Sequence, residues 1–73
     1  MPGTFRLLQV VRLVRDLPQE QLRKGMVGTV IEVFESPRVA YEVEFVDGKG
    51  RTTAQLALAG DDLEPALEHE GPG

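Results

Sequence analysis

Residues 39–58 read VAYEVEFVDGKGRTTAQLAL, and this stretch decides the fold class. Tyr41, Val43 and Phe45 alternate with small or acidic residues, which is the pattern of a strand with one face in the core and the other in water. Asp47-Gly48 follows and begins a tight turn, because this pair tolerates the positive φ that short hairpin connections require. The remainder returns as a second strand. The stretch therefore predicts a β-hairpin.

The returning strand is expected over Arg51–Leu58, with Ala54, Leu56 and Leu58 on its apolar face. Another strand is expected over Met26–Phe34. Gly28 inside that strand suggests a bulge or a close approach of two backbones.

The stretch Leu7–Val14 is ambiguous, because its apolar residues also satisfy helical spacing. Its β-branched valines and the lack of a convincing N-cap favour a strand. Two faces compete for burial: Leu8, Val10, Arg12 and Val14 form one, and Leu7, Gln9, Val11 and Leu13 form the other. A slip of one residue would exchange them, so the sequence leaves the buried face open.

The connections contain recognisable turn signals. A long loop is predicted over Asp16–Gly25, in which Gln19–Leu22 could form a single helical turn. Pro37 predicts a turn over Glu35–Arg38. A short closing element is expected over Asp61–Leu67, with Leu63 as its anchor.

The chain has 73 residues, which suffices for one domain, and we place this domain at residues 1–67. Residues 68–73 are expected to form a disordered acidic tail that contains His69, the only histidine. About five short strands are too few for a sandwich. They predict an all-β fold, a small five-stranded SH3-like barrel with a long loop after the first strand. Closure of such a barrel would remove exposed strand edges.

The composition narrows the function. There is no cysteine, so disulfides are excluded, and one histidine makes a zinc site improbable. No stretch is apolar enough for a membrane span or a secretion signal, so we expect a cytoplasmic protein. The net charge is −4, but it is unevenly spread: residues 1–25 carry five basic and two acidic residues, and the rest carries three basic and ten acidic. A thin core in so small a chain favours self-association or a protein partner.

Several segments between residues 8 and 58 share a recognisable pattern: Leu17-Pro18, Leu22, Gly25–Val33, Ala40–Phe45 and Asp47-Gly48. Together they resemble a family of small uncharacterised bacterial proteins. The resemblance implies an SH3-like barrel with no established activity. Members are often encoded beside another small uncharacterised protein, which implies a pair such as a toxin and its antitoxin. Gln9 departs from the acidic residue that is common in the family after the first leucine. A looser likeness to KOW-type barrels rests on Gly25, Gly28 and Val30.

A candidate partner surface follows from the expected alternation of the second strand. If Val27, Thr29, Ile31 and Val33 face inward, Val30 and Phe34 point outward as an apolar patch. The alternative is that a bulge at Gly28 switches the register and buries Val30, or that the C-terminal segment covers Phe34. Glu42 and Glu44 lie on one face of the next strand. Such carboxylates usually solvate a sheet and can also contact a partner.

An alternative partner is nucleic acid, contacted by Arg12, Arg15, Arg23 and Lys24 where the long loop meets the first strand. A pI of about 4.8 disfavours it, because nucleic-acid-binding domains are usually basic. No nucleophile, base and orienting group can be assembled from these residues. We therefore expect a non-catalytic interaction module (a subunit, an adaptor or an antitoxin-like partner) without a metal, cofactor or small-molecule substrate.

Overall fold

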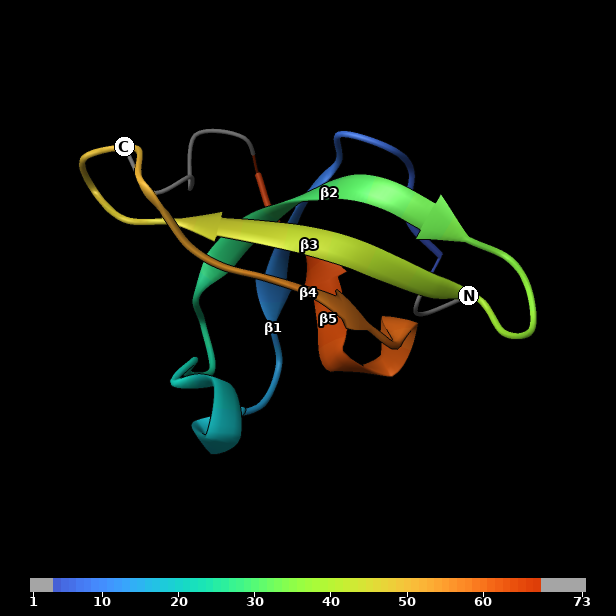
Figure 1. Cartoon of the computed structure of the whole chain (residues 1–73), viewed down its shortest axis with the longest axis horizontal. Helices are drawn as coiled ribbons and strands as arrows, with labels where there is room; N and C mark the ends of the chain where they lie inside the picture. Colours follow the sequence, from blue (N-terminus) through green and yellow to red (C-terminus); the bar gives the residue numbers. More distant parts are fainter. Residues whose placement is uncertain (1–3, 68–73) are drawn as a thin grey trace.

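The structure is a computed structural model, and it describes residues 4–67. Its strands are β1 (Val10–Leu13), β2 (Val27–Phe34), β3 (Ala40–Val46), β4 (Thr52–Leu58) and β5 (Leu63–Pro65). They form one antiparallel sheet in the order β4-β3-β2-β1-β5 (Figure 1). The expected all-β, five-stranded fold is confirmed, and it is consistent with a small SH3-like barrel.

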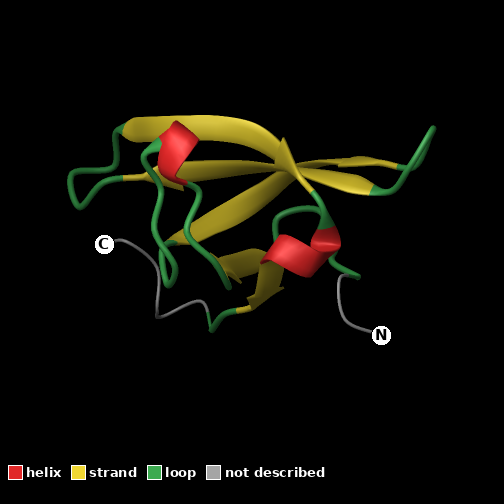
Figure 2. Cartoon of the chain, turned by 90° about the horizontal axis from the view of Figure 1, so that it is seen from below, coloured by secondary structure: helices red, strands yellow, loops and turns green. Residues whose placement is uncertain are grey.

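Two 3-10 turns connect strands: η1 (Pro18–Glu20) lies in the loop between β1 and β2, and η2 (Gly60–Asp62) joins β4 to β5. Figure 2 shows both in red and the sheet strongly bent. The predicted helical turn in the long loop thus exists, one residue earlier than expected and in 3-10 form. The loop ends at Gly25, whose φ of 94° is costly for residues other than glycine.

The hairpin over residues 39–58 forms as predicted. Tyr41, Val43 and Phe45 are buried. Their partners on β4 are Leu58, Leu56 and Ala54, respectively. The pairing shifts register near the turn, between Phe45 and Val46. The hairpin was readable from sequence because its alternation and its turn are both local signals.

The ambiguous N-terminal stretch forms a strand, but a shorter one than predicted. β1 begins at Val10, and Leu7 and Leu8 lie in a turn in which Leu8 has a φ of 69°. The pairings Val11 with Gly28 and Leu13 with Leu63 bury Val11 and Leu13. The open choice of face is therefore settled in favour of these two residues.

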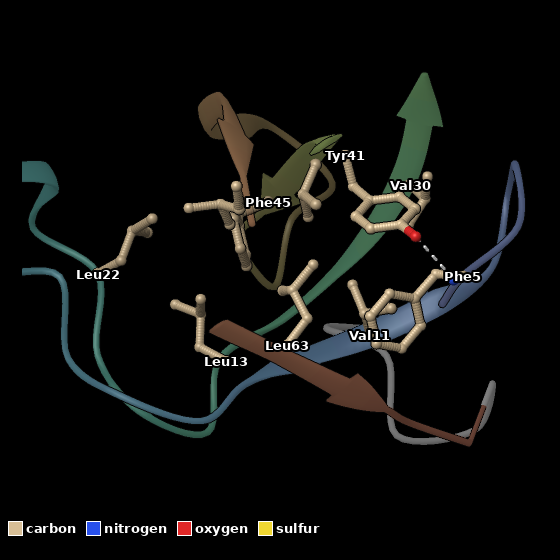
Figure 3. Close-up of a cluster of buried hydrophobic side chains, with 10 residues drawn as sticks. Phe5, Val11, Leu13, Leu22, Val30, Tyr41, Phe45 and Leu63 are labelled. Atoms are coloured by element: carbon tan, nitrogen blue, oxygen red, sulfur yellow. Dashed lines mark hydrogen bonds between the residues drawn. The ribbon is translucent and has the colours of Figure 1, made fainter. Parts of the chain in front are cut away.

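The core gathers side chains from the strands, the N-terminal segment and the long loop (Figure 3). Its members are Phe5, Val11, Leu13, Leu22, Val30, Tyr41, Val43, Phe45, Leu58 and Leu63. Full burial of one such aliphatic side chain contributes about 1.5–3 kcal/mol to folding. Leu63 is 4% exposed, which confirms its predicted role as the anchor of the closing element.

Phe5 was not assigned to the core from the sequence. Its ring packs edge-on against Tyr41, with the ring centroids 5.3 Å apart and the planes at 78°. Its backbone N–H donates to the Tyr41 hydroxyl oxygen at 3.2 Å, as the dashed line in Figure 3 marks. This hydroxyl therefore satisfies a backbone donor that would otherwise be buried without a partner.

Gly28 permits a close approach of β2 and β3, and it pairs regularly with Val11 on one side and Phe45 on the other. An added Cβ would lie 2.7 Å from the Glu44 carbonyl oxygen and 2.8 Å from Val43 Cγ1. Of the two roles suggested for this glycine, the close approach is correct. The register of β2 instead shifts between Val30 and Glu32.

Candidate functional site

The predicted apolar patch is only partly present. Val30 is 0% exposed and packs in the core, so its assignment to a partner surface is wrong. The physical reason is the phase of β2: Gly28 and Val30 face inward, and the irregularity at Ile31 then lets Val33 pack against the core. Phe34 remains at the surface with 39% exposure.

The predicted acidic residues lie on the outer face of the sheet, where both are half-buried. Glu44 Oε2 accepts a hydrogen bond from Thr52 Oγ1 at 2.7 Å, and Glu42 Oε2 accepts one from Gln55 Nε2 at 3.2 Å. Glu32 on β2 lies directly opposite Glu42. Like charges in this relation repel, so the outer face beside β4 is an acidic surface on which Glu32 and Glu42 disfavour each other. We call Glu32, Glu42 and Glu44 the acidic face.

The four basic residues of the alternative are partly engaged within the chain. Arg12 Nε lies 2.7 Å from Glu64 Oε2, and Arg15 Nε lies 2.9 Å from Asp62 Oδ1. Arg23 and Lys24 are exposed in the long loop. Binding of nucleic acid stays the alternative hypothesis, and these two ion pairs disfavour it because they compete with phosphate contacts.

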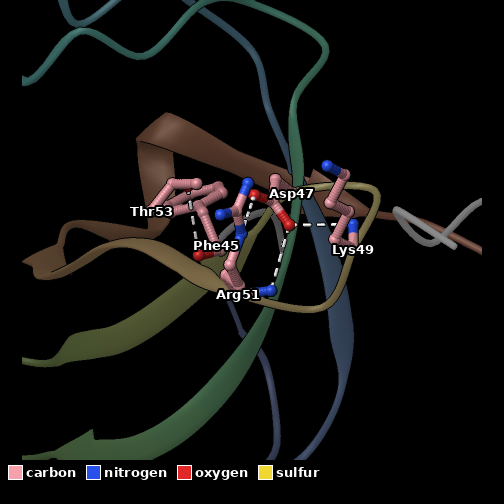
Figure 4. A network of polar contacts seen from close by, with 5 residues as sticks. All are labelled: Phe45, Asp47, Lys49, Arg51 and Thr53. Atoms are coloured by element: carbon pink, nitrogen blue, oxygen red, sulfur yellow. Dashed lines mark hydrogen bonds and ion pairs between the residues drawn. The ribbon is translucent and has the colours of Figure 1, made fainter.

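A polar network organises the β3–β4 turn (Figure 4). Asp47 Oδ1 accepts from the backbone N–H groups of Lys49 (2.8 Å) and Arg51 (3.0 Å), and Asp47 Oδ2 lies 3.0 Å from Arg51 Nε. These hydrogen bonds, chiefly the one from the Arg51 backbone, lower the pKa of Asp47 from its ordinary value of 3.8. These contacts give the Asp47 carboxylate a structural role, because they stabilise the turn.

The described residues include no group of three or more His, Asp or Glu that could hold a metal ion. Within residues 4–67 there is also no helix with the length and apolar character that crossing a membrane demands. His69 and the predicted tail over 68–73 lie outside the described residues.

The strand order leaves β4 and β5 at the two ends of the sheet, because no pairing joins them in the described part of the chain. Barrel closure was expected to remove exposed strand edges, but β4 and β5 are not hydrogen-bonded to each other, so each remains an edge strand among the described residues. The two edges differ in kind. β5 has three residues and ends at Pro65, whereas β4 has seven residues, TTAQLAL, without a charge or a proline.

Two hydrogen bonds of Val30 show which neighbouring strand its backbone N–H and C=O groups face. Its N–H donates to the Gln9 carbonyl at 3.0 Å, and its carbonyl accepts from the Leu8 N–H at 2.6 Å, so its peptide groups face the β1 side. In an antiparallel sheet, the backbone N–H and C=O groups of successive residues point toward opposite neighbouring strands. Thr29 therefore faces β3, where it exchanges hydrogen bonds with its partner Glu44.

The same alternation fixes the free edge of β4. The backbone groups of Glu44 point toward β2, so those of Val43 point toward β4 and exchange hydrogen bonds with its partner Leu56. The peptide groups of Gln55 and Ala57 consequently point away from β3. Both residues are exposed, and their outward N–H and C=O groups have no backbone partner among residues 4–67.

The opposite edge lacks such donors. The Ala66 N–H donates to the Val10 carbonyl at 3.0 Å, so Ala66 faces β1, and by alternation Leu63 and Pro65 face outward. Pro65 has no N–H, and the Leu63 N–H already donates to the Gly60 carbonyl. Proline and a short length are common means of blocking strand addition. One edge of the sheet is thus protected and the other is open.

A groove runs beside the open edge. It measures about 430 Å³ and lies between η1 and β4, lined by Leu17, Pro18, Gln19, Glu20, Leu56 and Leu58. Its apolar floor comes from the two β4 leucines, whose side chains lie on the inner side of the sheet. Open backbone groups and an apolar groove on one strand are the two elements that recognition by strand addition uses.

Sequence reasoning did not find this edge as a site. The available signal was the neutral composition of residues 52–58, with no lysine or proline to block pairing. That signal has meaning only once β4 is known to be an end strand, and strand order depends on contacts far apart in the sequence.

Fold and site together define a class: a small all-β module with one protected and one open sheet edge. A family profile, described as Domain of unknown function (DUF4926), matches residues 7–65, which is most of the chain. The protein belongs to this family. Neither curated proteins nor solved structures gave a match to this chain.

Proposed function

We propose that this protein is a non-catalytic interaction module that holds a protein partner by accepting an extended segment at β4. The observation that carries the proposal is the open edge itself: seven neutral residues present the outward peptide groups of Gln55 and Ala57 beside an apolar groove. Main-chain hydrogen bonds would supply affinity in this mode, and side-chain pockets would supply selectivity.

The asymmetry of the two edges supports the same proposal. An unprotected edge in a cytoplasmic protein invites uncontrolled pairing, and natural sheets usually block it. Here β5 is blocked by Pro65, so the chain uses this device where pairing is not wanted. We infer that β4 is left open because a partner covers it in the cell.

The remaining attributes fit a bacterial cytoplasmic protein with an SH3-like barrel that acts as a subunit, an adaptor or an antitoxin-like partner. No enzymatic role is part of this proposal. Asp47 is engaged in its turn, and Glu42 and Glu44 accept hydrogen bonds from β4 side chains, so these carboxylates have structural partners.

The test is Ala57→Pro, with Ala57→Ser as the matched control. Proline removes one outward donor without removing a hydrogen bond to β3, and proline is tolerated at this kind of edge position. Affinity-tagged forms of all three chains are expressed in the native host, and the co-purifying proteins are identified. A partner is expected with the wild type and Ala57→Ser and to be lost with Ala57→Pro.

Circular dichroism establishes that each variant is folded, and Gln55→Pro supplies a second edge variant if the first is not. The identified partner is then expected to slow hydrogen exchange at the amides of Gln55 and Ala57. Equal capture by a folded proline variant would refute strand addition. The absence of any partner, together with a strictly monomeric wild type, would refute the interaction role.

A further inference from the structure

The two sides of the open edge differ in chemistry, and an added strand would contact both. Side chains of a strand alternate between the two faces of its sheet. Alternate residues of an added segment would therefore point into the groove beside Leu56 and Leu58, and the others would continue the outer face beside Gln55 and Ala57.

The groove side selects apolar side chains. Leu17 and Pro18 line the groove together with the β4 leucines that form its floor, and Leu58 is only 6% exposed; the polar residues Gln19 and Glu20 also line it. An apolar side chain placed there would be removed from water against these four apolar residues, whereas an acidic one would lose hydration beside the carboxylate of Glu20.

The outer side selects positive charge. Across the sheet, Glu32, Glu42 and Ala57 follow one another in a single row, and the next position in this row belongs to the added strand. Adjacent strands lie about 4.8 Å apart. Ala57 has only a methyl group, so a lysine or arginine opposite it could extend over this methyl toward Glu42. Such a cation would relieve the repulsion between Glu32 and Glu42.

A second copy of the chain fits this edge less well. Its β4 would bring only neutral Gln55 and Ala57 to the outer face, so it would supply no positive charge for Glu42. Each chain also has a net charge of −4, which opposes association. The partner is therefore another molecule with basic residues.

We propose that the segment bound at β4 is an extended stretch of a partner protein in which apolar residues alternate with lysine or arginine. This inference rests on the proposed function and adds the chemistry of the partner. The apolar residues occupy the groove between η1 and β4, and the basic residues lie on the outer face toward Glu42.

The test uses synthetic peptides with blocked ends and NMR titration of the full chain. The first peptide alternates lysine and valine. The second replaces each lysine by glutamate, and the third has the composition of the first with its lysines and valines in separate blocks. The first is expected to bind and to shift the amide signals of Gln55 and Ala57, whereas the second and third are expected not to bind.

Two charge variants locate the contact. Glu42→Gln is expected to weaken the first peptide about two- to fivefold, the range of a solvent-exposed ion pair, and added salt should reduce this difference. Glu64→Gln is the matched control, because it removes the same charge from β5 at the opposite end of the sheet. It is expected to leave the affinity unchanged.

The outcomes separate this inference from the proposed function. Equal binding of the lysine and glutamate peptides, both lost in Ala57→Pro, would overturn the basic partner and leave strand addition in place. Binding of the first peptide that is unaffected by Ala57→Pro would overturn both proposals. Failure of all three peptides, or concentration-dependent dimers with protected Gln55 and Ala57 amides, would overturn the basic partner.

Discussion

Substitution of Gly28 by alanine tests the close approach of β2 and β3. The added Cβ would lie 2.7 Å from the Glu44 carbonyl oxygen, 2.8 Å from Val43 Cγ1 and 2.9 Å from Phe45 Cδ1. The nearest of these atoms belongs to backbone, so rotation of a side chain cannot remove the conflict. The two side chains belong to fully buried residues, which leaves little room for movement.

Two effects of this substitution oppose each other. Overpacking of a buried site costs about 1–3 kcal/mol. Alanine also restricts the unfolded chain, which stabilises a protein by about 0.4–1 kcal/mol where the backbone accepts it. Because the conflict involves backbone, we expect overpacking to dominate and Gly28→Ala to lower the free energy of unfolding by about 0.6–2 kcal/mol, which is each limit of the first range less the corresponding limit of the second.

The measurement is urea unfolding followed by circular dichroism. Gly50→Ala is the control, because Gly50 has a φ of 81° and open space around it, so alanine there tests backbone strain without a clash. A Gly28→Ala protein as stable as the wild type, or more stable, would refute the close approach as the reason for this glycine.

Three further predictions concern the hydroxyl of the core, the turn and the basic residues. Tyr41→Phe removes the acceptor of the Phe5 N–H, and we expect the free energy of unfolding in urea to fall by about 1–3 kcal/mol; an unchanged value would contradict the role of that hydrogen bond. Asp47 has a lowered pKa in the folded state, so the stability it contributes is present above pH 3.8 and is lost as the pH falls through the folded pKa. Asp47→Asn should therefore destabilise the protein at neutral pH, and urea titrations should show this difference disappearing well below pH 3.8. A difference that grows in acid would contradict this sign. Mixed single- and double-stranded RNA and DNA should not bind at low salt in a fluorescence anisotropy titration, and salt-sensitive binding would instead favour the nucleic-acid alternative.

The sequence predicted the orientation of side chains correctly in β3 but not in β2. Glu42 and Glu44 were placed on one outward face correctly, because alternation around Tyr41 and Val43 is a local pattern. Val30 was placed outward wrongly, because its orientation depends on the phase of β2 relative to its neighbours and on the shift at Ile31. A slip of one residue reverses every side chain of a strand, and both phases of β2 contain large apolar residues: Val30 and Phe34 on one, and Val27, Ile31 and Val33 on the other.

By itself, the sequence of this protein determined the hairpin over residues 39–58, the strand character of β2 and the anchoring role of Leu63, since each depends on alternation, turn residues or a large apolar side chain between acidic neighbours. Only the tertiary structure decided that Val11 and Leu13 face inward, that Phe5 joins the core, and that β4 is an open edge. The physical reason is that strand order and burial arise from contacts between segments distant in the chain, whereas period and turn chemistry are properties of neighbouring residues.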